Sequence, residues 1–189
     1  MKLLVLYDRE SRNYDGVDYY NQLRESSGLA GHDVDSVLLS TDEFSCCTGC
    51  FGCWVKTPGY CVNTRDKANE TIAKVIKSDI VIILSRVIYG SFSADIKVLI
   101  DRFTPLLLPF FENINGEMHH QKRYKKYPNW VALGYGNFTE DERNIFTELI
   151  SRNAINYHTP KYITVTARNG NEFQNVLDKI SNFAGGTSE

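Results

Sequence analysis

The chain has 189 residues and a mass of 21.6 kDa, so we expect a single domain over residues 1–189. Its hydrophobic content of 42% and charged content of 23% are those of a globular protein and exclude extended disorder. The formal net charge of −2 and the pI near 6.1 leave no basic excess for a phosphate backbone. We therefore expect no nucleic-acid partner.

The apolar runs are short. The longest, such as residues 80–84, fall far below the about 20 residues that a helix needs to span a bilayer. The N-terminal segment reaches Asp8 before a hydrophobic signal region can form, and no small-residue cleavage site follows it. We expect a cytoplasmic protein without a membrane partner.

Strand and helix patterns alternate along the chain. Five short segments have the apolar or alternating pattern of strands: residues 2–7, 33–39, 79–85, 130–133 and 162–166. Apolar residues at helical spacing predict a helix after each strand. Four of these helices are expected around residues 17–23, from Asn63 or Thr64 to 76, over 96–103 and over 173–180. The helix before the last one begins at a capping box of Thr139 and Glu142. Its inward face should consist of Ile145, Phe146, Leu149 and Ile150.

Five successive strand–helix units predict the fold class. Right-handed crossovers give a parallel sheet with helices on both faces. We expect a flavodoxin-like α/β three-layer sandwich whose five-stranded parallel sheet has the order 2-1-3-4-5. Ligands bind such sheets outside the carboxyl ends of the strands, at the switch point between strands 1 and 3. The loops after Tyr7, Ser85 and Leu133 should therefore form the site.

All five cysteines lie between Cys46 and Cys61. This crowding is not typical of the spread-out disulfide framework of a secreted domain. In residues 47–53 and 59–61 the spacing resembles the C-x2-C-x2-C…G-x-C stretch of NAD(P)H-dependent FMN reductases and of the related iron–sulfur flavoproteins. The flavin loop and the following helix of those proteins are similar to residues 87–93, Lys97 and residues 101–102. A further resemblance, to one flavodoxin-type subgroup of oxidoreductases, covers residues 109–111, 116–120 and 123–124.

This resemblance implies an FMN-dependent oxidoreductase. NAD(P)H would reduce the flavin, which would pass electrons to a quinone, a free flavin or another small acceptor, with no side chain acting as a catalytic acid. Relatives of this kind are commonly dimers, so a homodimer or higher homo-oligomer is implied. Residues 106–111 would be the dimer surface if exposed and part of the core if not.

The resemblance also implies where the flavin ring would lie. The residues expected beside it are Val87, Ile88, Tyr89, Gly90 and Ser91, with Gly136 and Asn137 on the opposite wall. Tyr89 could lie against the ring, and Gly90 would allow a close backbone approach. The alternative is a plain strand–turn–helix connection with a surface tyrosine.

The loop that would hold the phosphate departs from the family pattern. Flavin reductases of this kind usually have a Gly- and Ser-rich turn whose amides bind the FMN phosphate. Here Ser11, Arg12 and Asn13 are the candidates, but Asp8 and Glu10 would repel a phosphate unless they point away. The alternatives are an ordinary solvated loop and a non-catalytic protein that has lost FMN binding.

The cysteines allow two interpretations. Cys47, Cys50, Cys53 and Cys61 could supply four thiolates to a [4Fe–4S] cluster, as in an electron-carrying iron–sulfur flavoprotein. We favour reduced thiols that pack a loop beside the flavin cleft, and thus no metal. On the helix over 96–103 we expect Asp101 and Arg102 to form a structural ion pair, with Lys97 and Asp101 one turn apart.

Overall fold

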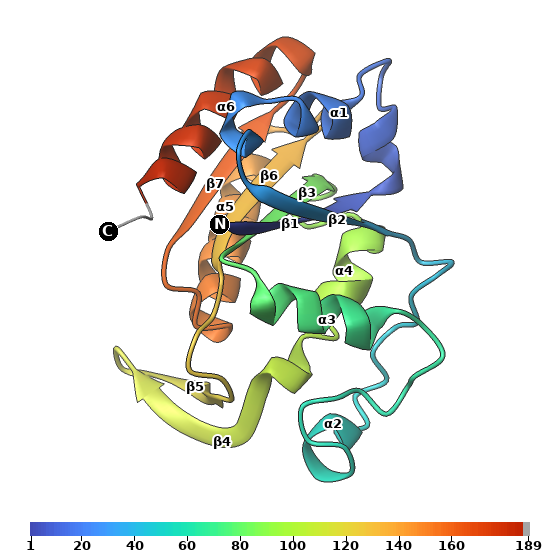
Figure 1. Cartoon of the computed structure of the whole chain (residues 1–189), viewed down its shortest axis with the longest axis vertical. Helices are drawn as coiled ribbons and strands as arrows, with labels where there is room; N and C mark the ends of the chain where they lie inside the picture. The colour runs from blue at the N-terminus through green and yellow to red at the C-terminus, as the bar shows by residue number, and fades with distance from the viewer. Residues whose placement is uncertain (187–189) are drawn as a thin grey trace.

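The central element is a five-stranded parallel sheet with the order β2-β1-β3-β6-β7 (Figure 1). It is seen in a computed structural model that describes residues 1–186. The strands are β1 (Lys2–Asp8), β2 (Asp33–Leu39), β3 (Ile80–Arg86), β6 (Asn129–Tyr135) and β7 (Tyr162–Ala167). The predicted flavodoxin-like order 2-1-3-4-5 is confirmed.

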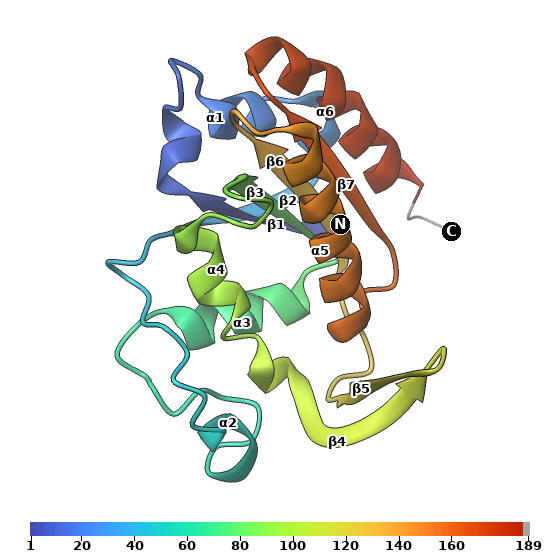
Figure 2. The same ribbon diagram turned by 180° about the vertical axis from the view of Figure 1, so that it is seen from behind.

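Helices cover both faces of the sheet and make three layers (Figures 1 and 2). On one face lie α1 (Tyr19–Arg24) and α6 (Gly170–Gly185), packed on the odd-numbered side chains of β1 such as Leu3 and Val5. On the other lie α3 (Ala68–Lys77), α4 (Ala94–Ile100) and α5 (Glu140–Asn156), packed on Leu4 and Leu6. Side chains alternate along a strand, so Tyr7 and Asp8 point to opposite faces.

A two-stranded antiparallel hairpin stands apart from the sheet, where the sequence patterns indicated no strands. It consists of β4 (Leu107–Ile114) and β5 (Glu117–Lys122). Residues 106–111 were predicted to be a dimer surface if exposed and core if buried, and they are partly each. Leu106 and Leu107 are buried, whereas Phe110 and Phe111 are 62% and 57% exposed. None of the described helices is long and apolar enough to cross a membrane.

Two details of the predicted helices were wrong. The helix expected from Asn63 or Thr64 begins at Ala68, because the side chain of Asp66 accepts the Ala68 N–H at 3.0 Å and ends the preceding loop. The capping box of Thr139 and Glu142 is confirmed. In that helix Phe146 and Ile150 are buried as expected, but Ile145 is 55% exposed, because it lies beside Gly90 of the loop after β3 and not in the core.

Candidate functional site

A cleft opens at the carboxyl end of the sheet, at the switch point between β1 and β3. It has a volume of about 370 Å³ and is lined by Asp8, Arg9, Glu10, Thr41, Ile88, Ser93, Ala94 and Asp95. The loops after β1, β2 and β3 and the start of α4 thus meet here. Sheets of this topology bind their ligands at this position.

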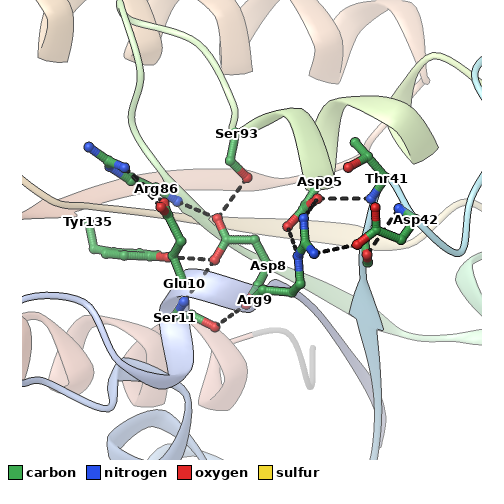
Figure 3. Close-up of polar contacts among 11 residues, drawn as sticks. Asp8, Arg9, Glu10, Ser11, Thr41, Asp42, Arg86, Ser93, Asp95 and Tyr135 are labelled. Carbon is green, nitrogen blue, oxygen red and sulfur yellow. Dashed lines mark hydrogen bonds and ion pairs between the residues drawn. The ribbon is translucent and has the colours of Figure 1, made fainter.

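Asp8 lies at the centre of the site, as Figure 3 shows. It is only 1% exposed. One carboxylate oxygen accepts the Ser11 N–H at 3.1 Å and the Tyr135 hydroxyl at 2.5 Å. The other accepts the Arg86 N–H at 2.8 Å and the Ser93 hydroxyl at 2.7 Å. Burial raises the pKa of Asp8, and these donors oppose that rise.

The arginines around the cleft are paired with carboxylates. The guanidinium of Arg9 donates to Asp95 at 3.0 Å and to Asp42 at 2.5 Å. The guanidinium of Arg86 donates to both carboxylate oxygens of Glu10 at 3.0 Å. The cleft therefore holds a network of ion pairs within the protein, drawn in Figure 3.

The three consecutive residues predicted to hold a phosphate have different surroundings and do not form one site. Ser11 is fully buried, and its hydroxyl donates to the carbonyl of Asp8 at 2.6 Å. Arg12 lies over the ring of Tyr20, 4.2 Å from its centroid, on the face covered by α1 and α6. Asn13 is exposed, and its N–H donates to the Glu10 carbonyl at 3.0 Å. The turn after β1 therefore does not fit a phosphate group as it stands.

We expect Arg12→Ala to change flavin affinity by less than about twofold, because the guanidinium points away from the cleft. It should instead lower the free energy of unfolding by about 1 kcal/mol, through loss of the cation–π contact and of the 3.0 Å bond to the Tyr7 hydroxyl. Urea denaturation and flavin titration of the same preparation measure both. A tenfold loss of affinity would place Arg12 in the site after all.

The loop after β3 has one residue in the cleft lining and an exposed aromatic residue beside it in sequence. Val87 is buried, Ile88 lines the cleft, and Tyr89 is 87% exposed with φ of 50°. Ile88 and Ser91 exchange backbone hydrogen bonds of 3.0 and 2.9 Å, which fix the turn. The turn therefore holds one exposed aromatic side chain next in sequence to Ile88, which lines the cleft.

Gly90 is required where it stands. Its φ is 73°, and a Cβ there would lie 2.6 Å from Cγ2 of Ile145. Gly90→Ala should therefore lower the free energy of unfolding by about 1–3 kcal/mol and displace the Tyr89 turn. Thermal unfolding measures the loss. Gly116→Ala is the control for a positive φ alone, since nothing lies within 4 Å of a Cβ at that position; an equal loss in both variants would disprove the steric contact.

The loop after β6 also lies at the carboxyl end of the sheet. Gly136 has φ of 113° and donates its N–H to the Ala167 carbonyl at 3.2 Å. Asn137 is exposed, and its N–H donates to the Tyr14 hydroxyl at 3.3 Å. Tyr14 thus joins the loop after β1 to the loop after β6. Tyr14, Tyr135 and Asp95 were not predicted, because no local pattern marks a residue whose partner is distant in the chain.

The cysteines line a separate cavity of about 70 Å³. Its walls are Cys46, Cys47, Thr48, Gly49, Cys50, Phe51, Cys53, Cys61, Val62, Asn63, Arg102, Thr104 and Pro105. Burial and the nearby Cys61 raise the pKa of Cys53, whereas the Gly52 N–H and the Thr48 hydroxyl lower that of the exposed Cys50. Within residues 1–186, no group of three or more His, Cys, Asp or Glu is arranged to hold a single metal ion.

A buried ion pair holds the cysteine loop against the end of α4. Arg102 pairs with Asp66, and its guanidinium also donates to the carbonyls of Ser45 and Asn63 at 3.2 Å. The predicted pair of Asp101 with Arg102 was wrong, because Arg102 points inward to the loop. The exposed pair of Lys97 with Asp101 is confirmed.

Comparison with known proteins identifies the fold. No family model matches the chain. An iron–sulfur flavoprotein of Archaeoglobus fulgidus is 40% identical over 76 residues, which is 40% of this chain and only 33% of that protein. An FMN-dependent NADH-azoreductase of Bacillus anthracis in complex with FMN superposes with a TM-score of 0.66 at 11% identity, covering 100% of this chain and 99% of the other. The fold is flavodoxin-like. An NAD(P)H:quinone oxidoreductase of Methanothermobacter marburgensis gives a TM-score of 0.67 at 12% identity, covering 100% and 98%.

Proposed function

We propose that this protein is a flavin-dependent oxidoreductase in which NAD(P)H reduces bound FMN and the flavin passes electrons to a quinone, a free flavin or another small acceptor. The supporting observation is the cleft between the loops after β1 and β3, the position at which flavodoxin-like sheets take FMN. Full-length similarity in fold to an FMN-dependent azoreductase adds support.

In this proposal the flavin supplies the redox chemistry, and the chain binds and orients it. Val87, Ile88, Tyr89, Gly90 and Ser91 form the turn on which the ring rests, and Gly136 and Asn137 form the opposite wall. The exposed Tyr89 provides an aromatic face, and the buried Val87 anchors the turn through an N–H bond of 2.9 Å to the Tyr135 carbonyl.

The test is a visible absorption spectrum of anaerobically purified protein, before and after addition of FMN. A flavin spectrum that bleaches with NADH or NADPH would support the proposal and identify the donor. Protein that binds neither FMN nor riboflavin would disprove it. Tyr89→Ala should weaken flavin binding about tenfold through loss of ring contact, whereas Tyr162→Ala, which removes another exposed tyrosine at the far end of the sheet, should leave it unchanged.

A second candidate function is electron transfer by an iron–sulfur flavoprotein. It is favoured by the convergence of Cys47, Cys50, Cys53 and Cys61 on one cavity, since four thiolates can hold a [4Fe–4S] cluster. Anaerobic purification followed by iron and sulfide analysis tests it. About four irons per chain, lost in Cys53→Ser but retained in Cys46→Ser, would establish the cluster; iron-free protein would disprove it.

We also propose that the protein is a cytoplasmic homodimer or higher homo-oligomer. Five free thiols suit a reducing compartment. The exposed Phe110, Phe111 and Met118 gather on the β4–β5 hairpin and offer an apolar surface for a second copy. Sedimentation velocity of the wild type and of Phe110→Ser would test this, and a monomeric wild type would disprove it.

A further inference from the structure

The turn after β1 already contains an anion. The short 3-10 helix Arg9–Arg12 begins at Asp8, whose own carboxylate accepts the Ser11 N–H. In flavin-binding proteins of this fold, backbone amides in this turn are expected to receive a phosphate. Here the Asp8 carboxylate accepts the amide N–H instead, and it also accepts hydrogen bonds from the Arg86 N–H and from the Ser93 and Tyr135 hydroxyls.

We propose that Asp8 takes the place of the cofactor's phosphate group, so that this chain recognises a flavin through its ring and gains no affinity from the phosphate. The inference rests on the proposed function. Its consequence is that FMN and riboflavin bind with similar affinity.

The charges around Asp8 support this assignment. Four carboxylates belong to the network, those of Asp8, Glu10, Asp42 and Asp95, against the two guanidinium groups of Arg9 and Arg86. Both guanidinium groups already donate to carboxylates of the network. A phosphate carries about 1.5 to 2 negative charges at neutral pH, so it would enter a site that is already anionic.

The geometry opposes displacement of Asp8 by an incoming phosphate. The carboxylate is buried, and its two oxygens accept four hydrogen bonds from four different segments of the chain. Moving it aside would leave a buried charge without those donors, which is strongly unfavourable. Arg12, the remaining cation of the turn, lies across the sheet on the ring of Tyr20.

The experiment compares FMN and riboflavin by quenching of flavin fluorescence. Wild-type protein should bind the two flavins with dissociation constants within about threefold of each other. Asp8→Ser removes the charge and opens the Ser11 amide, whereas Asp8→Asn removes the charge at nearly constant volume but keeps an acceptor on that amide. Asp8→Ser should bind FMN at least about tenfold more tightly than wild type, and Asp8→Asn should gain less, while riboflavin binding is unchanged in both. Inorganic phosphate should then compete with FMN in Asp8→Ser and not in the wild type.

Asp15→Asn is the matched control, because it removes one charge from an exposed position in the loop after β1, outside the cleft lining, and leaves Asp8 on the Ser11 amide. It should change the FMN-to-riboflavin ratio by less than about threefold. A wild type that prefers FMN about a hundredfold, or Asp8 variants that shift both flavins equally, would overturn the inference alone. If neither flavin binds to the wild type or to the variants, the proposed function is overturned and this inference with it.

Discussion

Asp66→Asn is expected to lower the free energy of unfolding by about 3–5 kcal/mol, because it leaves the buried charge of Arg102 without its counter-ion. The side chains of Arg102 and Asp66 are only 1% and 4% exposed. Arg102→Met should cost less, since the Asp66 carboxylate keeps the N–H groups of Ser45 and Ala68 at 2.9 and 3.0 Å. The double variant should be less destabilised than the sum of the two. Urea denaturation of the four proteins measures the coupling.

The control is the exposed pair of Lys97 with Asp101 on the same helix. Asp101→Asn should cost less than about 1 kcal/mol, because water screens this pair. If it cost as much as Asp66→Asn, burial would not be the cause of the larger effect. Loss of the Asp66 pair should also loosen the cysteine loop, which rapid alkylation of Cys53 in the variant would reveal.

The same pair predicts a dependence of stability on pH. Burial acts to raise the pKa of Asp66, but the N–H groups of Ser45 and Ala68 and the Arg102 guanidinium outweigh it and hold that pKa below its ordinary value of 3.8. A carboxyl group whose pKa is lowered by folding stabilises the folded state at pH values above its ordinary pKa. This stabilisation is lost as the pH falls through the pKa that the group has in the folded state. The stability difference between wild type and Asp66→Asn should therefore be full at neutral pH and shrink below pH 3.8.

Much of the fold could be predicted because it depends on local periodicity. The buried strands β1, β3 and β6 have nearly continuous apolar sequences, and right-handed crossovers leave few ways to connect them. The β4–β5 hairpin could not be predicted in this way. Its strands mix Pro, Glu, Asn, His and Lys with exposed aromatic residues, so neither face shows the alternation that a half-buried strand requires.

The position of the candidate site could be predicted, but its internal bonds could not. Parallel topology alone brings the loops after β1 and β3 together. In contrast, Asp8 meets Tyr135 across 127 residues, and Arg102 meets Asp66 across 36. A charged side chain in a sequence carries no information on the face to which it points. For this reason Arg12 was predicted to bind a phosphate, whereas its guanidinium lies over the rings of Tyr7 and Tyr20.

Phe146→Ala is the second substitution expected to have a large effect, with a loss of about 3–5 kcal/mol in the free energy of unfolding. Phe146 is fully buried in the face covered by α3, α4 and α5. Its ring meets that of Phe92 edge-on at 5.6 Å, and one ring carbon would lie 2.9 Å from a Cβ on Gly134. It thus supports β6 and the turn after β3 together, and removing it leaves a cavity beneath the candidate flavin site.

Phe146→Ala should also weaken flavin binding, because the Tyr89 turn packs against this part of α5. We expect weaker flavin binding in Phe146→Ala at temperatures at which the variant is still folded, measured by fluorescence titration beside circular dichroism. Phe146→Leu keeps most of the volume and should restore most of both quantities. Phe173→Ala, an equally buried phenylalanine on the opposite face, should lose similar stability without weakening binding. Equal loss of binding in both variants would show that general destabilisation, and not support of the Tyr89 turn, is the cause.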